Sequence, residues 1–327
     1  MRTNNLLKKY SKSQKMMRTV IRSLIPIVVF ATYINGLRVL LLLALVLLTG
    51  SLMEYFWEKK QGNKASEAIF VTCVLYTLTL PATIPFWIAI IGILFGVFFG
   101  KLVFGGFGKN IFNPALVGRA FVYVNFPEPL TIWWNEAASG FPGGLGTYVA
   151  NTIDVISKAT PMITFKNYNE VMEIKNLFLG FVPGSIGETS KILIILAAVY
   201  LIYKKAAPWQ IMAGSLIGFI STSSILYFFT DLNVSNPLYG MLLGGFLFGT
   251  VFMATDPVSA AKTETGKWIY GIIIGLVTVL IRGLSLFNGG MMFAILIGNT
   301  FAPIIDYFIK EAKIRKNKKE VLSWKNH

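Results

Sequence analysis

The feature that most constrains this chain is a series of apolar runs that approach 20 residues and continue from residue 20 to residue 309. About 20 apolar residues are enough for a helix to cross the hydrocarbon core of a bilayer, which is about 30 Å thick. Only helices or closed barrels satisfy the backbone in lipid, and these runs are too long and too continuously apolar for barrel strands. The sequence therefore predicts an all-α polytopic membrane protein.

We predict ten transmembrane helices, five on each side of a long polar connection. Their ranges are 20–35, 38–57, 65–81, 84–104, 110–125, 190–204, 207–229, 238–254, 268–285 and 288–309. Such a division is typical of membrane folds built from two structural repeats, which often place a site at the repeat interface. The predicted segments are a basic tail (1–19), a first repeat (20–125), an extracytoplasmic connection (126–189), a second repeat (190–309) and a second basic tail (310–327).

A short internal echo favours such a duplication. Asn113–Arg119 and Asp256–Lys262 each begin with an Asn/Asp-Pro step and carry a cation five residues after the proline. Each also follows a run rich in glycine and phenylalanine.

The distribution of basic residues sets the expected orientation. The formal net charge is +15, but the Lys and Arg residues gather beside apolar runs, which is the pattern of membrane topology rather than of nucleic-acid binding. With the N-terminus inside, the segments on the inner side hold 23 of the 30 basic residues, whereas the 126–189 connection holds three. We therefore expect a multi-pass protein of the prokaryotic inner membrane with both termini cytoplasmic.

Several redox cofactors are excluded by composition. Cys73 is the only cysteine and His327 the only histidine. This chain alone therefore builds no disulfide, no cysteine-ligated iron–sulfur cluster and no haem held by two histidines within the membrane. Cys73 itself falls inside an apolar run, where a small buried residue is the simplest interpretation.

The first candidate site is the stretch Gly105–Arg119. Asn110 and Asn113 are three residues apart, so they share a face if the segment is helical. Two amides at a helix break can read a polar planar ligand by hydrogen bonding. The alternative is an inner loop followed by a helix that starts at Pro114, with the asparagines satisfying loose backbone.

The second candidate is Asp256, a carboxylate at a helix end beside Pro257. Such a carboxylate can bind a cation or orient a ligand; the alternative is that Asp256 caps the following helix in an ordinary turn. For Asp306 and Arg282, which lie near span ends, we expect snorkelling toward water.

The third candidate is the glycine-rich stretch Pro183–Ser190. Ser185 and Glu188 match a capping box before an apolar run, which predicts a helix N-terminus. Free N–H groups there favour an anion, and Lys191 lies close by, although Glu188 opposes it. A rival hydroxyl is that of Thr160 in Ser157–Pro161, which we rank lower because it lacks flanking glycines and lies in the middle of the connection.

Four motifs together carry a family resemblance. They are GGFGKNIFNPALVGR (Gly105–Arg119), GSIGETS (Gly184–Ser190), FMATDPVSA (Phe252–Ala260) and NTFAPIID (Asn299–Asp306). With these motifs in this order, the chain resembles the RnfD/NqrB family of flavoprotein membrane subunits from its first apolar run to its last.

The resemblance implies a fold similar to ammonium and urea transporters, with two five-helix repeats. It also implies FMN joined through its phosphate to a threonine. The motif matches that threonine to Thr189, with Ser185, Gly187 and Glu188 as the frame of the site.

The family further implies a second, non-covalent flavin, riboflavin, for which Asn110 and Asn113 match the motif. Asp256 is then a candidate ligand residue or a candidate for ion coupling. The two flavins would relay electrons across the membrane.

The short N-terminal segment looks closer to RnfD than to NqrB, whose extension is usually longer. That choice predicts a subunit of an Rnf complex, which transfers electrons between ferredoxin and NAD and moves Na⁺ or H⁺. Expected partners are the other Rnf subunits, including a second covalent-flavin subunit and iron–sulfur subunits, together with membrane lipid. The alternatives are an NqrB-like subunit of a Na⁺-translocating NADH:quinone oxidoreductase and a cofactor-free solute channel of the ammonium/urea type.

Overall fold

The computed structural model describes residues 2–138, 140–149, 159–188, 190–230, 232–285, 287 and 289–325, and within these ranges all regular structure is helical. The first part of the chain forms α1 (Arg2–Asn35), α2 (Arg38–Lys60), α3 (Ala68–Leu78), α4 (Phe86–Val97), the π-helix η1 (Phe98–Leu102) and α5 (Pro114–Asn125). The connection carries α6 (Pro127–Thr131), η2 (Gly143–Gly146), α7 (Pro161–Tyr168) and α8 (Ile174–Leu179). The last part forms α9 (Lys191–Tyr203), α10 (Trp209–Phe229), α11 (Pro237–Leu242), α12 (Phe246–Phe248), the π-helix η3 (Gly249–Met253), α13 (Glu264–Leu284) and α14 (Gly290–Lys325).

Five helices in the described part of the chain are long and apolar enough to cross a membrane, which supports the predicted multi-pass class. They include residues 15–35, 38–60, 209–229, 264–284 and 290–317. Three further apolar helices, 68–78, 86–102 and 191–203, are shorter. Ten uninterrupted spans are therefore not confirmed.

The interruptions have local causes. The run 65–81 ends its helix at Leu78, just before Pro81, and the next helix begins only after Pro85. The run 238–254 breaks at Gly244, whose φ of +57° is strained for residues with a side chain. Proline and glycine inside apolar runs thus turn two expected spans into helix pieces.

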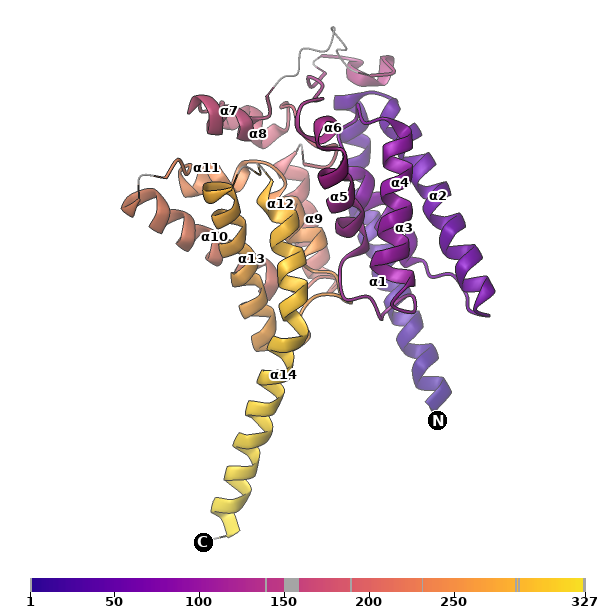
Figure 1. Cartoon of the computed structure of the whole chain (residues 1–327), viewed down its shortest axis with the longest axis vertical. Helices are drawn as coiled ribbons and strands as arrows, with labels where there is room; N and C mark the ends of the chain where they lie inside the picture. Colours follow the sequence, from indigo (N-terminus) through magenta and orange to yellow (C-terminus); the bar gives the residue numbers. More distant parts are fainter. Residues whose placement is uncertain are drawn as a thin grey trace.

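The helices form two groups. Figure 1 shows α1 to α5 on one side and α10, α13 and α14 on the other, with α9 and α12 between them. Glycines allow close approach within each group: Gly96 faces the backbone of Gly118 across α4 and α5, and Gly218 and Gly275 do the same across α10 and α13. The helices α6 to α8 lie at one end of the molecule, and both termini leave at the other.

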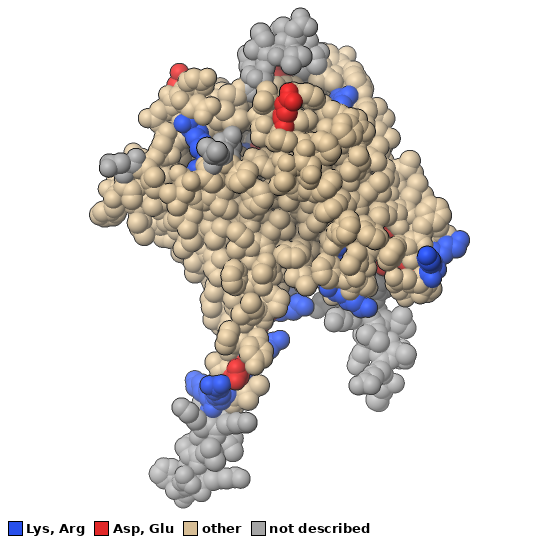
Figure 2. All heavy atoms as spheres, in the orientation of Figure 1, with Lys and Arg blue, Asp and Glu red and all other residues tan. Residues whose placement is uncertain are grey.

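Charged side chains concentrate at the two ends of the body. In Figure 2 a broad band without Lys, Arg, Asp or Glu crosses the visible face, and most of the blue spheres lie below it, on the side of the termini. This arrangement agrees with the predicted membrane orientation. The segments predicted as basic tails continue the helices, since α1 begins at Arg2 and α14 ends at Lys325.

A buried ion pair links α2 to η1. The Lys101 ammonium lies 2.6 Å from the Glu54 carboxylate, and the two side chains are 2% and 0% exposed. Ser66 completes the cluster, because its backbone N–H and its hydroxyl both donate to Glu54. Desolvated charges persist only when paired and hydrogen-bonded, so this cluster fixes the end of α2 against η1.

We predict that Lys101→Met lowers the unfolding midpoint in detergent, by a free energy of about 3–5 kcal/mol, because it leaves the Glu54 carboxylate buried and unpaired. The matched control is Arg315→Met, which breaks the exposed pair with Glu311 (74% and 36% exposed). Exposed pairs contribute at most about 1 kcal/mol. Equal effects of the two variants would contradict a structural role for the buried pair.

Candidate functional site

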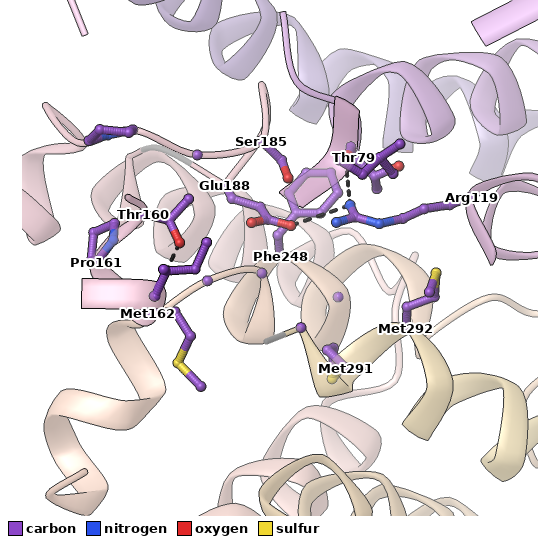
Figure 3. A pocket seen from close by; sticks show the side chains of 18 of the residues that line it. Thr79, Arg119, Thr160, Pro161, Met162, Ser185, Glu188, Phe248, Met291 and Met292 are labelled. Carbon is purple, nitrogen blue, oxygen red and sulfur yellow. Dashed lines mark hydrogen bonds and ion pairs between the residues drawn. The ribbon is translucent and has the colours of Figure 1, made fainter. Parts of the chain in front are cut away.

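The largest pocket lies under the connection, at the end of the molecule opposite the termini (Figure 3). Its empty space, counted out to the open mouth, is about 1050 Å³. The walls come from α5 and α7, from the loops after α3 and α11, and from the starts of η3 and α14. We call it the loop-side pocket; its polar and charged lining includes Thr79, Arg119, Thr160, Ser185, Glu188, Lys191 and Arg282.

The glycine-rich stretch reaches this pocket by pairing with the end of α3. The backbone N–H of Ile186 donates to the carbonyl of Leu80 at 2.9 Å, and that of Gly187 donates to Leu78 at 2.7 Å. A Cβ on Gly187 would lie 2.7 Å from the Leu78 Cβ, so only glycine permits this approach. The pairing places Ser185 and Glu188 in the lining.

Arginine side chains satisfy the carbonyls that the helix breaks leave open around the pocket. Arg119 donates to the carbonyl of Thr79, directly after α3. Arg282 donates to Gly240 at 2.8 Å and to Leu243 at 3.0 Å, at the end of α11. The expected snorkelling of Arg282 is wrong, because the side chain is 7% exposed and bonds these inner carbonyls.

The pocket carries an excess of positive charge. Its lining holds three cations, Arg119, Lys191 and Arg282, and one carboxylate, Glu188. Arg119 lies 3.5 Å from Glu188, and the Lys191 ammonium donates to the Glu188 carbonyl. Low-dielectric surroundings strengthen this field, so an anionic group is favoured here.

Two buried polar atoms at this pocket have no partner among the residues that the structure describes. They are the hydroxyl oxygen of Ser185 and Nε of Arg282, on side chains 1% and 7% exposed. An unpaired buried donor costs about 1–3 kcal/mol. Both atoms therefore point to a ligand with acceptor groups.

The predicted frame residues Ser185 and Glu188 line the pocket, and Gly187 shapes the loop behind them. Thr189 lies outside the described residues. The capping-box prediction is wrong, because α9 begins at Lys191 with Ser190 as its cap, the hydroxyl of which accepts from Leu193 at 3.4 Å.

A threonine that the sequence ranked second also lines the pocket. Thr160 is the N-cap of α7, and its hydroxyl accepts from the backbone N–H of Ile163 at 3.3 Å. Figure 3 shows it across the cavity from Ser185 and Glu188. The Thr-Pro step that opens α7 was a visible N-cap signal, but no local pattern indicated that α7 folds onto the glycine-rich stretch.

The same helix is anchored by Lys166, which donates to the carbonyl of Ser285. Partial burial lowers the pKa of this amine. The contact holds α7 over the end of α13, where Arg282 lies.

A second pocket lies on the side of the termini. Its empty space is about 680 Å³, and it contains the predicted residues Asn110, Asn113 and Asp256 together. We call it the termini-side pocket. Both pockets share α3, α5 and the η3 region: Thr72, Pro114 and Thr255 line this one, whereas later residues of α3 and α5 approach the other.

Asn110 and Asn113 do not share a helix face, because α5 begins only at Pro114. Asn113 caps α5 by accepting from Ala115 at 3.0 Å, and its amide donates to Met253 at 3.4 Å. Asn110 donates to Phe112 at 3.0 Å. Thus Asn113 shapes the wall, while Asn110 keeps hydrogen-bonding capacity beyond this one bond.

Asp256 closes the opposite wall with a tight turn. Its carboxylate accepts from the N–H of Val258 at 3.2 Å and from the Ser259 hydroxyl at 2.8 Å. It does not cap the following helix, because α13 begins at Glu264 with Thr263 as its cap.

Fold and pockets together define a multi-pass helical membrane protein with two ligand-sized pockets at opposite ends of shared helices. The chain belongs to the NQR2, RnfD, RnfE family, whose model matches residues 1–315.

Similar curated proteins carry the name of the NqrB component of Na(+)-translocating NADH-quinone reductase. The protein of Chromohalobacter salexigens is 42% identical over 305 residues, covering 89% of this chain and 70% of the relative. That of Azotobacter vinelandii is 41% identical over 283 residues (84% and 67%), and that of Yersinia pestis 39% over 288 residues (84% and 67%). These relatives are subunits of an ion-translocating oxidoreductase, which is the class that the motifs predict for this chain.

The prediction of an RnfD-type subunit of an Rnf complex is wrong, because relatives at about 40% identity over most of the chain are NADH-quinone reductase subunits. The four motifs do not separate the two branches of the family. The length of the N-terminal segment, on which the choice depended, is a poor guide, since termini tolerate change more readily than packed helices.

We predict that Gly187→Ala lowers the unfolding midpoint in detergent by about 1–3 kcal/mol, because its Cβ overpacks against Leu78. Gly184→Ala is the matched control, since nothing lies within 4 Å of a Cβ there. If both variants unfold alike, the pairing with α3 does not determine this loop.

Proposed function

We propose that this chain is the flavin-carrying membrane subunit of a Na⁺-translocating NADH–quinone reductase type of complex, with further subunits of that complex as partners. The observation that carries this proposal is the loop-side pocket, in which an excess of cations surrounds two buried donors that lack partners among the described residues. A cofactor-free channel of the ammonium/urea type has no need for either feature.

The lining fits FMN. The cations of Arg119, Lys191 and Arg282 suit its phosphate or an electron-rich ring, and the Ser185 hydroxyl and Arg282 Nε suit ring carbonyls. When bound, the flavin supplies one- and two-electron transfer. The residues of this chain orient it, limit water beside it and set its potential through their charge.

A threonine phosphoester at this pocket can come from either of two residues. Described contacts support Thr160, because it lines the pocket and caps α7, so a phosphate there would meet the N–H groups of the first turn. Thr189 remains the prediction from the sequence motif. Its neighbour Glu188 lines the same pocket.

The termini-side pocket suits the second, non-covalent flavin, which we propose to be riboflavin. Apolar walls enclose a planar ring, and the amide of Asn110 supplies hydrogen bonds. Asp256 stands opposite, within the same lining. Electrons would pass between the two pockets along the shared helices.

We further propose that the helix pieces complete two repeats that place both termini in the cytoplasm of a prokaryotic inner membrane. Two observations support the repeats: Asn113 and Asp256 each follow a π-helix, and each accepts from the N–H two residues later. On this arrangement the loop-side pocket is extracytoplasmic.

For the tether, we predict that Thr160→Ala abolishes the covalent flavin that wild-type protein shows by in-gel fluorescence and by peptide mass mapping. Thr131→Ala, another threonine of the lining, is the control and should keep it. Loss of flavin in Thr189→Ala with retention in Thr160→Ala would instead assign the tether to Thr189. Absence of a covalent flavin in the wild type would refute the site.

For the second flavin, we predict that Asn110→Ala weakens riboflavin binding about tenfold, the worth of one hydrogen bond. The measurement is flavin released by acid from purified protein, followed by riboflavin titration. Asn125→Ala, an exposed asparagine at the end of α5, should bind as wild type. Unchanged binding in Asn110→Ala would place the second flavin elsewhere.

A further inference from the structure

The motif Asn299–Asp306 on α14 has no role in the function proposed so far. Both of its ends nevertheless bind the segment that follows η3. Asp306 accepts from the backbone N–H groups of Lys262 and Thr263 at 2.7 and 2.9 Å. Its expected snorkelling is thus wrong, and α14 holds this segment from the side.

Asn299, at the other end of the motif, is fully buried and joins three separate segments. Its side-chain oxygen accepts from the backbone N–H of Asn113 at 3.2 Å. Its amide group donates to the carbonyl of Ser259 at 3.3 Å and to the hydroxyl of Tyr270 at 2.8 Å. One side chain therefore uses both its donor and its acceptor to bridge α5, the η3–α13 loop and α13.

Two of these partners belong to opposite walls of the termini-side pocket. Asn113 lines one wall, and Ser259 directly follows Val258 in the other. The direct link between the walls is the bond from Asn113 to Met253, which at 3.4 Å is long for a hydrogen bond. The path through Asn299 is the shorter-bonded one, although Asn299 does not itself line the pocket.

We propose that Asn299 is the positioning residue of the termini-side pocket: it sets the separation of the Asn113 wall from the Asp256 wall and so determines binding of a planar, hydrogen-bonding ligand between them. This inference rests on the proposed second flavin.

An amide is required for this role. Aspartate keeps the acceptor for Asn113 but loses the donor to Ser259 and directs a carboxylate at a carbonyl. Serine is too short to reach both walls. Each change frees one wall without touching the ligand.

The test compares wild type with Asn299→Asp, Asn299→Ser and the control Thr300→Ala, whose exposed residue is next on α14 and bonds only within its own helix among the described residues. Each protein is purified with its complex, depleted of free flavin and titrated with riboflavin. Covalent flavin by in-gel fluorescence reports on the loop-side pocket, and the absorption spectrum at saturating riboflavin reports on the ring environment.

We expect both Asn299 variants to raise the Kd for riboflavin about tenfold, the loss of one hydrogen bond. The spectrum of bound riboflavin should shift, whereas covalent flavin and the Thr300→Ala protein should match wild type. An unchanged Kd and spectrum would overturn the proposal. Parallel loss of covalent flavin, or failure of both variants to accumulate, would also overturn it, by making Asn299 a residue of folding in general.

A wild type that binds no riboflavin has a different meaning. In that case the proposed second flavin fails, and the positioning role fails with it. A wild type that binds while the Asn299 variants bind equally well removes only the positioning role.

Discussion

The structure depends on how this protein satisfies main-chain carbonyls where helices break inside an apolar body. In lipid, open carbonyls have no water to accept from. Three arginines supply the donors: Arg38 bonds Ala82 at 2.8 Å and Ile84 at 2.7 Å after α3, Arg119 bonds the same loop, and Arg282 bonds the end of α11. Without these donors the breaks would be too costly to keep.

The same solution charges the loop-side pocket. Arg119 and Arg282 reach the breaks from α5 and α13, and Lys191 joins them at the start of α9. Only Glu188 offsets them within the lining. A pocket made by helix breaks is therefore also a pocket that attracts an anion, and this connects the architecture to a flavin phosphate. On the opposite side, the Asn113 and Asp256 turns build the second pocket from the ends of the same elements.

Much of this was predictable from the sequence, for identifiable reasons. Apolar length determines the membrane class, and the motif residues Asn110, Asn113 and Asp256 do meet in one pocket. Helix breaks were less predictable, because Pro81 and Gly244 act within otherwise continuous apolar runs.

Contacts between distant segments could not be predicted, since no local pattern encodes them. Arg282 and Asp306 were expected at the membrane surface, but each finds main-chain partners about 40 residues away. Thr160 reaches the pocket through the folding of α7, and Asn299 meets Asn113 across 186 residues. The branch of the family was also beyond the motifs, because both branches share them.

The most direct test of the central claim is the flavin content of the purified wild-type chain, divided into a fraction that stays with the protein after acid denaturation and a fraction that is released. A subunit with a tethered flavin in the loop-side pocket and a second flavin in the termini-side pocket contains one equivalent of each. A chain with no flavin in either fraction, despite assembly with its partner subunits, would contradict the account.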